Sequence, residues 1–204
     1  MLFRSSFFLR VPTSLVGHNQ PILRPKCSDK LDYEAELAVV IGKTARHVAK
    51  ADALNYVLGY SCFNDGTLRD YQRKTSQWTI GKNFDRTGGF GPCFVTPDEL
   101  PTGAKGLSIK SILNGKVMQS ANTDDMLFPV DETIALLTEC LTLEPGDVIA
   151  MGTPAGVGYA RKPPVWMKDG DVIDIEIEKI GTLRNPIRDR KSTRLNSSHG
   201  YISY

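Results

Sequence analysis

The sequence has few of the features that mark specialised protein classes. Only four of its 204 residues are cysteines, at positions 27, 62, 93 and 140, and no two of them form a Cys-x-x-Cys pair. This spacing argues against a disulfide framework or a zinc site and predicts free thiols in a reducing compartment. We therefore expect a cytoplasmic protein.

Two further absences restrict the expected partners. No stretch approaches the roughly 18–20 consecutive apolar residues that span a bilayer, so we expect no membrane partner. The apolar cluster at the N-terminus is interrupted by Arg4 and is followed by no small-residue cleavage site, which argues against a signal peptide. The net charge is only +2 and no basic cluster alternates with aromatic residues, so we expect no nucleic-acid partner.

What remains is a chain of ordinary globular composition, 41% hydrophobic and 24% charged, long enough for one domain with a sizeable core. Many short strand patterns and two helical ones predict an α+β fold that is mostly β. Residues 7–17 read as a strand followed by a proline and glycine loop, and further strands are expected at 34–42, 60–63, 93–96, 147–151 and 172–179. A hairpin is expected over 107–119, turning at Asn114-Gly115. Helices are expected at 48–58 and 131–141, the second with Asp131 as N-cap. Residues 67–74 read as helical or irregular and residues 81–91 as a glycine-rich loop.

The final segment, residues 190–204, differs from the rest. It has no hydrophobic periodicity and resembles translated adapter sequence. We predict one domain over residues 1–189, and a non-native or disordered tail over residues 190–204.

The strongest strand pattern carries two carboxylates, Glu34 and Glu36, just before an apolar run. Residues i and i+2 of a strand point to the same face, so the two carboxylates would lie side by side and repel each other unless a cation joins them. All-oxygen ligation suits Mg²⁺, Mn²⁺ or Ca²⁺ better than zinc. The alternative is an exposed edge strand with two solvated acids, and spacing alone favours it.

A third carboxylate, Asp65, follows a short apolar strand in an Asn-Asp-Gly turn. A loop carboxylate held at the end of a strand completes the three-carboxylate set that an open divalent-cation site uses. Taken alone, the same residues form an ordinary turn.

Several motifs together resemble the fumarylacetoacetate hydrolase family, in its order and spacing, across residues 8–188. They are Asp32-Tyr-Glu-Ala-Glu-Leu-Ala-Val-Val-Ile-Gly, Gly59-Tyr-Ser-Cys-Phe-Asn-Asp-Gly, Gly81-Lys-Asn-Phe-Asp, Gly91-Pro, Leu113-Asn-Gly and Gly152-Thr-Pro-Ala-Gly-Val-Gly. The resemblance implies a mixed β-roll with a few short helices, usually a homodimer. It also implies that Glu34, Glu36 and Asp65 hold Mg²⁺ or Mn²⁺.

The resemblance assigns five further residues to the site. Lys82 and Thr153 become catalytic residues that face a substrate carboxylate or a developing oxyanion. Arg69, Gln72 and Arg10 become substrate-binding residues. A solvated loop lysine, a simple turn before Pro154 and surface arginines are the alternative interpretations that the residues themselves leave open.

Many members of the family carry a His-x-x-Glu pair ahead of the segment that matches residues 7–17, and no such pair occurs in this sequence. We accordingly expect an N-terminally incomplete catalytic domain whose metal site is retained.

The resulting hypothesis is a divalent-metal-dependent hydrolase that cleaves a C–C bond of a small 2-oxo or 1,3-dioxo carboxylic acid through an enolate. Two alternatives stay open. One is an isomerase or decarboxylase of the same family, such as a 2-hydroxymuconate-type isomerase or an oxaloacetate decarboxylase. The other is an inactive metal-binding fragment.

Overall fold

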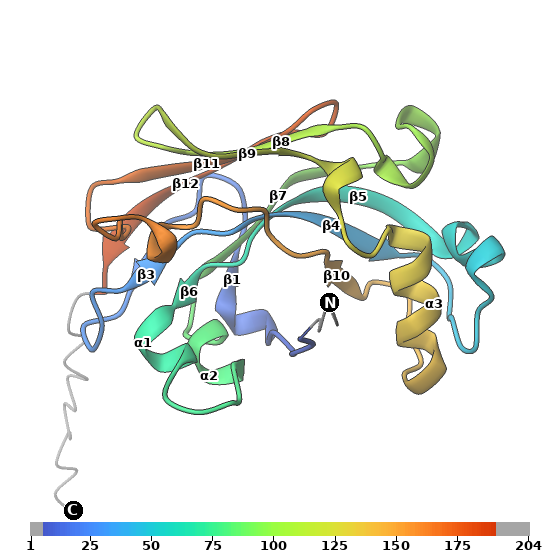
Figure 1. Cartoon of the computed structure of the whole chain (residues 1–204), viewed down its shortest axis with the longest axis horizontal. Helices are drawn as coiled ribbons and strands as arrows, with labels where there is room; N and C mark the ends of the chain where they lie inside the picture. The colour runs from blue at the N-terminus through green and yellow to red at the C-terminus, as the bar shows by residue number, and fades with distance from the viewer. Residues whose placement is uncertain (1–5, 191–204) are drawn as a thin grey trace, which may run out of the picture.

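Two five-stranded sheets are stacked, and apolar side chains fill the space between them (Figure 1). The computed structural model describes residues 6–190. One sheet has the strand order β1-β7-β5-β4-β10 and the other β2-β12-β11-β8-β9, while β3 and β6 form a small third sheet. The mostly β, α+β prediction is confirmed.

The strands are short and mostly antiparallel. Their bounds are β1 Leu15–Val16, β2 Ile22–Arg24, β3 Leu31–Asp32, β4 Ala35–Ile41, β5 Val57–Asn64, β6 Thr67–Leu68, β7 Gly88–Val95, β8 Ser108–Leu113, β9 Lys116–Asn122, β10 Val148–Ala150, β11 Val172–Ile177 and β12 Gly181–Asp189. The α-helices are α1 Arg69–Gln72, α2 Thr79–Lys82 and α3 Val130–Cys140. The 3-10 turns are η1 Pro12–Ser14, η2 Lys50–Tyr56, η3 Pro97–Glu99, η4 Thr102–Ala104, η5 Thr123–Asp125 and η6 Gly158–Ala160.

Strand β4 lies inside its sheet, between β5 and β10, and all seven of its residues are buried. Its odd-numbered residues, from Ala35 to Ile41, join the hydrophobic core, whereas Ala38 and Val40 do not. The even-numbered residues therefore point to the opposite face of the sheet. Burial on both faces explains why this strand reads as a nearly continuous apolar run.

The hairpin between β8 and β9 turns where the sequence predicts. Asn114 and Gly115 have φ values of 51° and 80°, the left-handed conformation that a tight hairpin turn requires and that asparagine and glycine tolerate best. Asn114 also accepts a hydrogen bond from the Val172 N–H at 2.9 Å, which ties the turn to β11. This local prediction is confirmed.

Other predicted elements differ from the structure. The helix expected over 48–58 is the 3-10 segment η2, because the chain must already pair Val57 with Ile41 at the start of β5. Within 7–17 only Leu15–Val16 form a strand, since η1 begins at Pro12. The predicted N-cap, Asp131, lies in the first turn of α3 instead, where its negative charge still favours the helix N-terminus.

Two strands differ from what the sequence indicates. The glycine-rich segment expected to be a loop includes the start of β7, where close packing requires glycine: a Cβ at Gly89 would lie 2.5 Å from the Asn185 side-chain oxygen. Strand β12 was not predicted at all, because Pro186 interrupts its pattern. The predicted tail lies outside the described residues except for Arg190, whose N–H donates to the Arg24 carbonyl at 2.9 Å.

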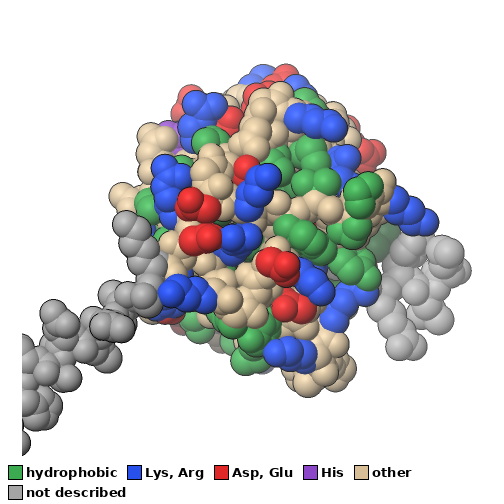
Figure 2. Space-filling view, turned by 90° about the vertical axis from the view of Figure 1, so that its left-hand side faces the viewer, with side chains coloured by type: hydrophobic (Ala, Val, Ile, Leu, Met, Phe, Trp, Pro, Cys, Tyr) green, Lys and Arg blue, Asp and Glu red, His purple; other side chains and the backbone are tan. Residues whose placement is uncertain are grey.

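The surface shown in Figure 2 intersperses Lys and Arg side chains with Asp and Glu, so this face carries no large patch of one sign. Among the described residues, no helix is long and apolar enough to cross a membrane.

Candidate metal centre

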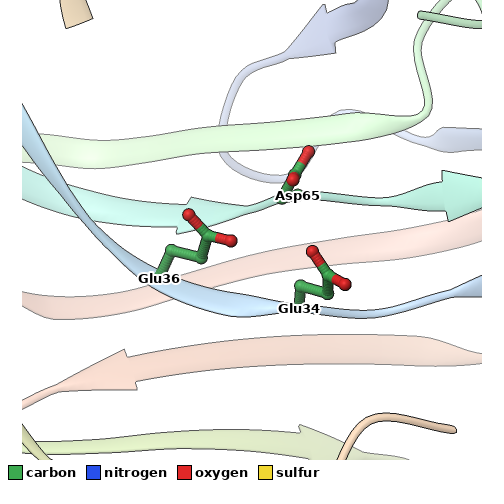
Figure 3. Close-up of side chains that lie close together, drawn as sticks. All are labelled: Glu34, Glu36 and Asp65. Atoms are coloured by element: carbon green, nitrogen blue, oxygen red, sulfur yellow. The ribbon is translucent and has the colours of Figure 1, made fainter. Parts of the chain in front are cut away.

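Three carboxylates converge on the face of β4 that points away from the hydrophobic core (Figure 3). Glu36 extends from β4, Glu34 comes directly before β4, and Asp65 comes directly after β5. Antiparallel pairing of Ala35 with Asn64 brings Asp65 beside Glu34, and the Asp65 N–H donates to the Glu34 carbonyl at 2.9 Å. One oxygen from each carboxylate lies within 4.8 Å of the others, and all three residues are buried.

The Asn-Asp-Gly sequence is required by this packing. The side-chain oxygen of Asn64 accepts a hydrogen bond from the Glu34 N–H at 3.1 Å and so joins the ends of β4 and β5. A Cβ at Gly66 would lie 1.8 Å from the Thr87 carbonyl oxygen, a distance that excludes every other residue type. The turn is therefore part of the site and not a surface connection.

Two of the carboxylates are paired with cations. The Nζ atom of Lys82, at the end of α2, lies 2.6 Å from Glu34 Oε2 and 2.5 Å from Asp65 Oδ2. Arg69 Nη2 lies 2.6 Å from Glu34 Oε1, and Arg10 forms an ion pair with Asp65 Oδ1. Every carboxylate oxygen of Glu34 and Asp65 thus faces a cation.

Glu36 has no cationic partner among the described residues. It accepts one hydrogen bond, from the Gly152 N–H at 2.9 Å, although it is only 4% exposed. Burial raises the pKa of Glu36 well above its usual value, and the neighbouring Asp65 and Glu34 raise it further. A buried carboxylate without a cation is costly, so Glu36 marks the place where positive charge is lacking.

Burial and neighbouring charges also shift the pKa values of Glu34 and Asp65. Burial raises the pKa of Glu34, although Lys82 opposes this. Burial acts in the same direction on Asp65, but the charges of Lys82 and Arg10 outweigh it and lower the pKa of Asp65.

The donor set fits a hard divalent cation. Four buried carboxylates, those of Asp32, Glu34, Glu36 and Asp65, are accompanied by the cations Arg10, Arg69 and Lys82, which leaves one negative charge uncompensated. Carboxylate oxygens are the ligands that Mg²⁺, Mn²⁺ and Ca²⁺ prefer. The triad could therefore hold such an ion, with Glu36 as the carboxylate that gains most from it.

Asp32 is a site residue to which the sequence assigned no role. It is fully buried and accepts four hydrogen bonds, from Arg69 Nε (2.8 Å) and from the N–H groups of Tyr33 (2.8 Å), Gly158 (2.7 Å) and Tyr159 (2.9 Å). It therefore orients Arg69 and fastens the loop that follows β10. Its position two residues before Glu34, at strand spacing, was the available signal.

Thr153 lies in that same loop, next to the Gly152 that contacts Glu36. Its hydroxyl oxygen accepts a hydrogen bond from the side-chain amide of Gln119 at 2.8 Å. Gln119, a buried residue of β9, carried no signal in the sequence.

The structure thus brings the predicted site residues into one region. Glu34, Glu36, Asp65 and Lys82 form its centre, and Arg10 and Arg69 contact the carboxylates. Gln72 accepts a hydrogen bond from Arg69 at 3.0 Å, so in this structure it contacts the arginine. The catalytic and substrate-binding roles assigned to these residues stay predictions.

Comparison with known proteins decides the family. The model of the fumarylacetoacetate (FAA) hydrolase C-terminal domain matches residues 2–188. The chain belongs to the fumarylacetoacetate hydrolase family. This confirms the resemblance, and it agrees with the curled sheets of the fold.

Members of the family that resemble this chain carry the names of different enzymes. The chain is 42% identical over 182 residues to the mitochondrial oxaloacetate tautomerase of Xenopus laevis, covering 88% of this chain and 57% of the relative. A solved fumarylacetoacetate hydrolase from Exiguobacterium antarcticum has a TM-score of 0.88 at 43% identity, covering 92% of this chain and 68% of that one. A 2-hydroxyhepta-2,4-diene-1,7-dioate isomerase from Mycobacterium marinum has a TM-score of 0.83 at 38% identity, covering 91% and 69%.

Family homologues of this chain are enzymes, and isomerase and tautomerase are among their names. The chain spans a little over half of the Xenopus relative's length, so it corresponds to part of that protein.

Proposed function

We propose that this chain catalyses the divalent-cation-dependent keto–enol tautomerisation of oxaloacetate or a closely similar 2-oxo dicarboxylic acid. The names of the Xenopus and Mycobacterium marinum relatives support this choice, since a tautomerase or isomerase moves a proton and a double bond and removes no atoms. The expected C–C bond hydrolysis is the second candidate. It is favoured by the name of the Exiguobacterium structure.

The observation that carries the proposal is the contact of the Lys82 ammonium group with two carboxylates of the triad, at 2.5 and 2.6 Å. Glu34, Glu36 and Asp65 would hold the ion, and a divalent cation supplies Lewis-acid stabilisation of negative charge on the oxygen of a 2-oxo acid. Lys82 adds a fixed positive charge in a buried environment, where electrostatic stabilisation of an enolate is strongest.

The neighbouring residues hold the rest of the substrate. Thr153 follows Gly152, whose N–H contacts Glu36, and Arg69 contacts Glu34 at the other end of the triad. Two carboxylates of a dicarboxylic substrate would thus meet polar groups on both sides of the reacting carbon. Oxaloacetate has this distribution of charge.

The test begins with calorimetric titration of Mg²⁺ and Mn²⁺ into the chain and into Asp65→Ala, followed by ultraviolet measurement of the decay of enol oxaloacetate. We expect one binding site that Asp65→Ala abolishes, and a catalysed decay that falls at least about 100-fold in Glu36→Gln. The exposed Glu99→Gln is the matched control and should behave as the wild type.

Three outcomes separate the candidates. Acceleration with unchanged substrate mass supports tautomerisation, and two product fragments from a dioxo acid indicate hydrolysis. Metal binding without turnover of either substrate would identify a binding domain and contradict the proposal.

We further propose a cytoplasmic homodimer, as the cysteine pattern and the family suggest. Light scattering should give twice the chain mass of 22.5 kDa.

A further inference from the structure

The side-chain amide of Gln119 connects two parts of the site. It is 1% exposed and extends from β9 to β4 and to the loop after β10, which are 84 and 34 residues away in the sequence. Its Oε1 atom accepts a hydrogen bond from the Ala35 N–H at 3.0 Å, between the two glutamates of the triad. Its Nε2 atom donates to Thr153 Oγ1 and to the Pro154 carbonyl, both at 2.8 Å.

The main chain fixes which way this amide faces. At one end stands an N–H group, that of Ala35, which can only donate. At the other end stands a carbonyl group, that of Pro154, which can only accept. Turning the amide over would place donor against donor and acceptor against acceptor in a buried site, an arrangement that costs two hydrogen bonds. The Nε2 atom is therefore the one that faces Thr153.

This orientation determines what the Thr153 hydroxyl can do. A hydroxyl has one proton and two lone pairs. Because its oxygen already accepts the Gln119 proton, its own proton points elsewhere, and none of the residues that the structure describes accepts it. Thr153 is half-buried, so that proton is free to meet a ligand.

We infer that Gln119 is a positioning residue which occupies one acceptor site of the Thr153 hydroxyl and leaves its proton free for a ligand, so that this side of the site favours an anionic oxygen. The ligand class is a carboxylate or an enolate. The inference rests on the proposed function, because that function supplies the anion.

The test is a double-mutant cycle read by calorimetry with oxalate as the probe, in the presence of Mg²⁺. Oxalate offers adjacent anionic oxygens like those of the oxaloacetate enolate, and its binding needs no turnover. The four proteins are the wild type, Gln119→Met, Thr153→Val and the double variant, and Gln20→Met, at an exposed loop position, is the matched control.

We expect Thr153→Val to weaken oxalate binding about tenfold and Gln119→Met about five- to tenfold. The double variant should be no weaker than Thr153→Val alone, because Gln119 acts only through the hydroxyl. A merely structural role of Gln119 would weaken binding by the same factor in both backgrounds. Thr153→Ser should keep most of the affinity.

Independent effects of the two substitutions would overturn the inference, and so would absence of oxalate binding to the wild type. If Gln119→Met does not fold, Gln119→Glu takes its place in the cycle. It keeps an acceptor for the Ala35 N–H, but its second oxygen would take the Thr153 proton, so we expect Gln119→Glu to weaken oxalate binding by a larger factor in the Thr153 background than in the Thr153→Val background.

Turnover of oxaloacetate is measured separately. Coupled oxalate binding without turnover would refute the proposed function and leave the role of Gln119 in place. Turnover together with independent effects of the two substitutions would support the proposed function and refute the role of Gln119.

Discussion

The ammonium group of Lys82 lies 2.5 Å from the Asp65 carboxylate, and both side chains are almost completely buried. A buried ion pair is stable only while both partners are present, since removing one leaves an uncompensated charge. The same ammonium contacts Glu34 at 2.6 Å, so Lys82 supplies within the protein part of the positive charge that the triad requires.

Replacing Lys82 should increase the effect of metal on stability. We expect Lys82→Met to lower the free energy of unfolding of the metal-free protein by about 3–5 kcal/mol. Saturating Mg²⁺ should then raise the melting temperature of this variant more than that of the wild type, because the ion binds carboxylates whose negative charge Lys82 no longer neutralises. Chemical denaturation measures the free energy of unfolding, and differential scanning fluorimetry measures the melting temperature. Lys50→Met, at an exposed ion pair with Glu132, should leave them unchanged, and an equal metal-induced shift in Lys82→Met would contradict the prediction.

Replacing Glu36, unlike replacing Lys82, should stabilise the metal-free protein. Glu36 is buried, and in the described part of the chain it has no cationic partner and accepts only the Gly152 N–H, which a glutamine oxygen can also accept. Glu36→Gln should therefore raise the metal-free unfolding free energy by about 1–2 kcal/mol, since it removes a buried charge that repels Glu34 and Asp65. Chemical denaturation with and without Mg²⁺ checks this. Retention of the metal-induced stabilisation by Glu36→Gln would exclude Glu36 as a ligand.

Asp32 should matter for the site although it lies outside the triad. In Asp32→Asn the side-chain amide N–H must face donors that the carboxylate accepted, either Arg69 and Tyr159 at one oxygen or Tyr33 and Gly158 at the other. We expect a loss of about 3–5 kcal/mol in stability and a weaker Mg²⁺ affinity, because Arg69 no longer holds Glu34 in place. Denaturation and calorimetry test the two effects separately. Asp189→Asn, at a half-exposed ion pair with Arg24, is the control and should change neither.

The four cysteines should react unequally. Burial raises the pKa of the Cys62 thiol to about 12, whereas Cys27, Cys93 and Cys140 are exposed. At pH 8 an aromatic disulfide reagent should therefore modify three thiols quickly and the fourth only after denaturation, because the thiolate is the reactive form. In Cys62→Ala the fast phase should be unchanged and the slow one absent. Four fast thiols in the native wild type would show that the packing between the sheets opens readily.

Part of this protein follows from local sequence patterns. The apolar run of β4, the Asn114-Gly115 turn and the Glu34–Glu36 spacing each depend on neighbours within a few residues. Strand periodicity then places both glutamates on one face, whatever surrounds them. The family motifs added Asp65 and Lys82 to the predicted site. Without the motifs, these residues could equally have been a solvated turn and a surface lysine.

The tertiary structure decided the rest. Segment 50–56 has helical spacing but forms a 3-10 turn, because β5 must begin at Val57 to pair with β4. Glycines 88 and 89 read as loop residues, yet they form a strand because they pair with β1 and, at Gly89, also with β5. Propensity is overruled wherever a long-range contact is worth more than the local preference.

The sequence by itself determined the mostly β fold and the three carboxylates. Only the tertiary structure decided that, within residues 6–190, Glu36 is the triad carboxylate without a cationic partner, that Asp32 holds Arg69, and that Gln119 faces Thr153 with its amide protons. These are contacts between segments 34–126 residues apart, and no local pattern records them. They exist because the stacked sheets bury polar side chains, which must then find partners across the whole chain.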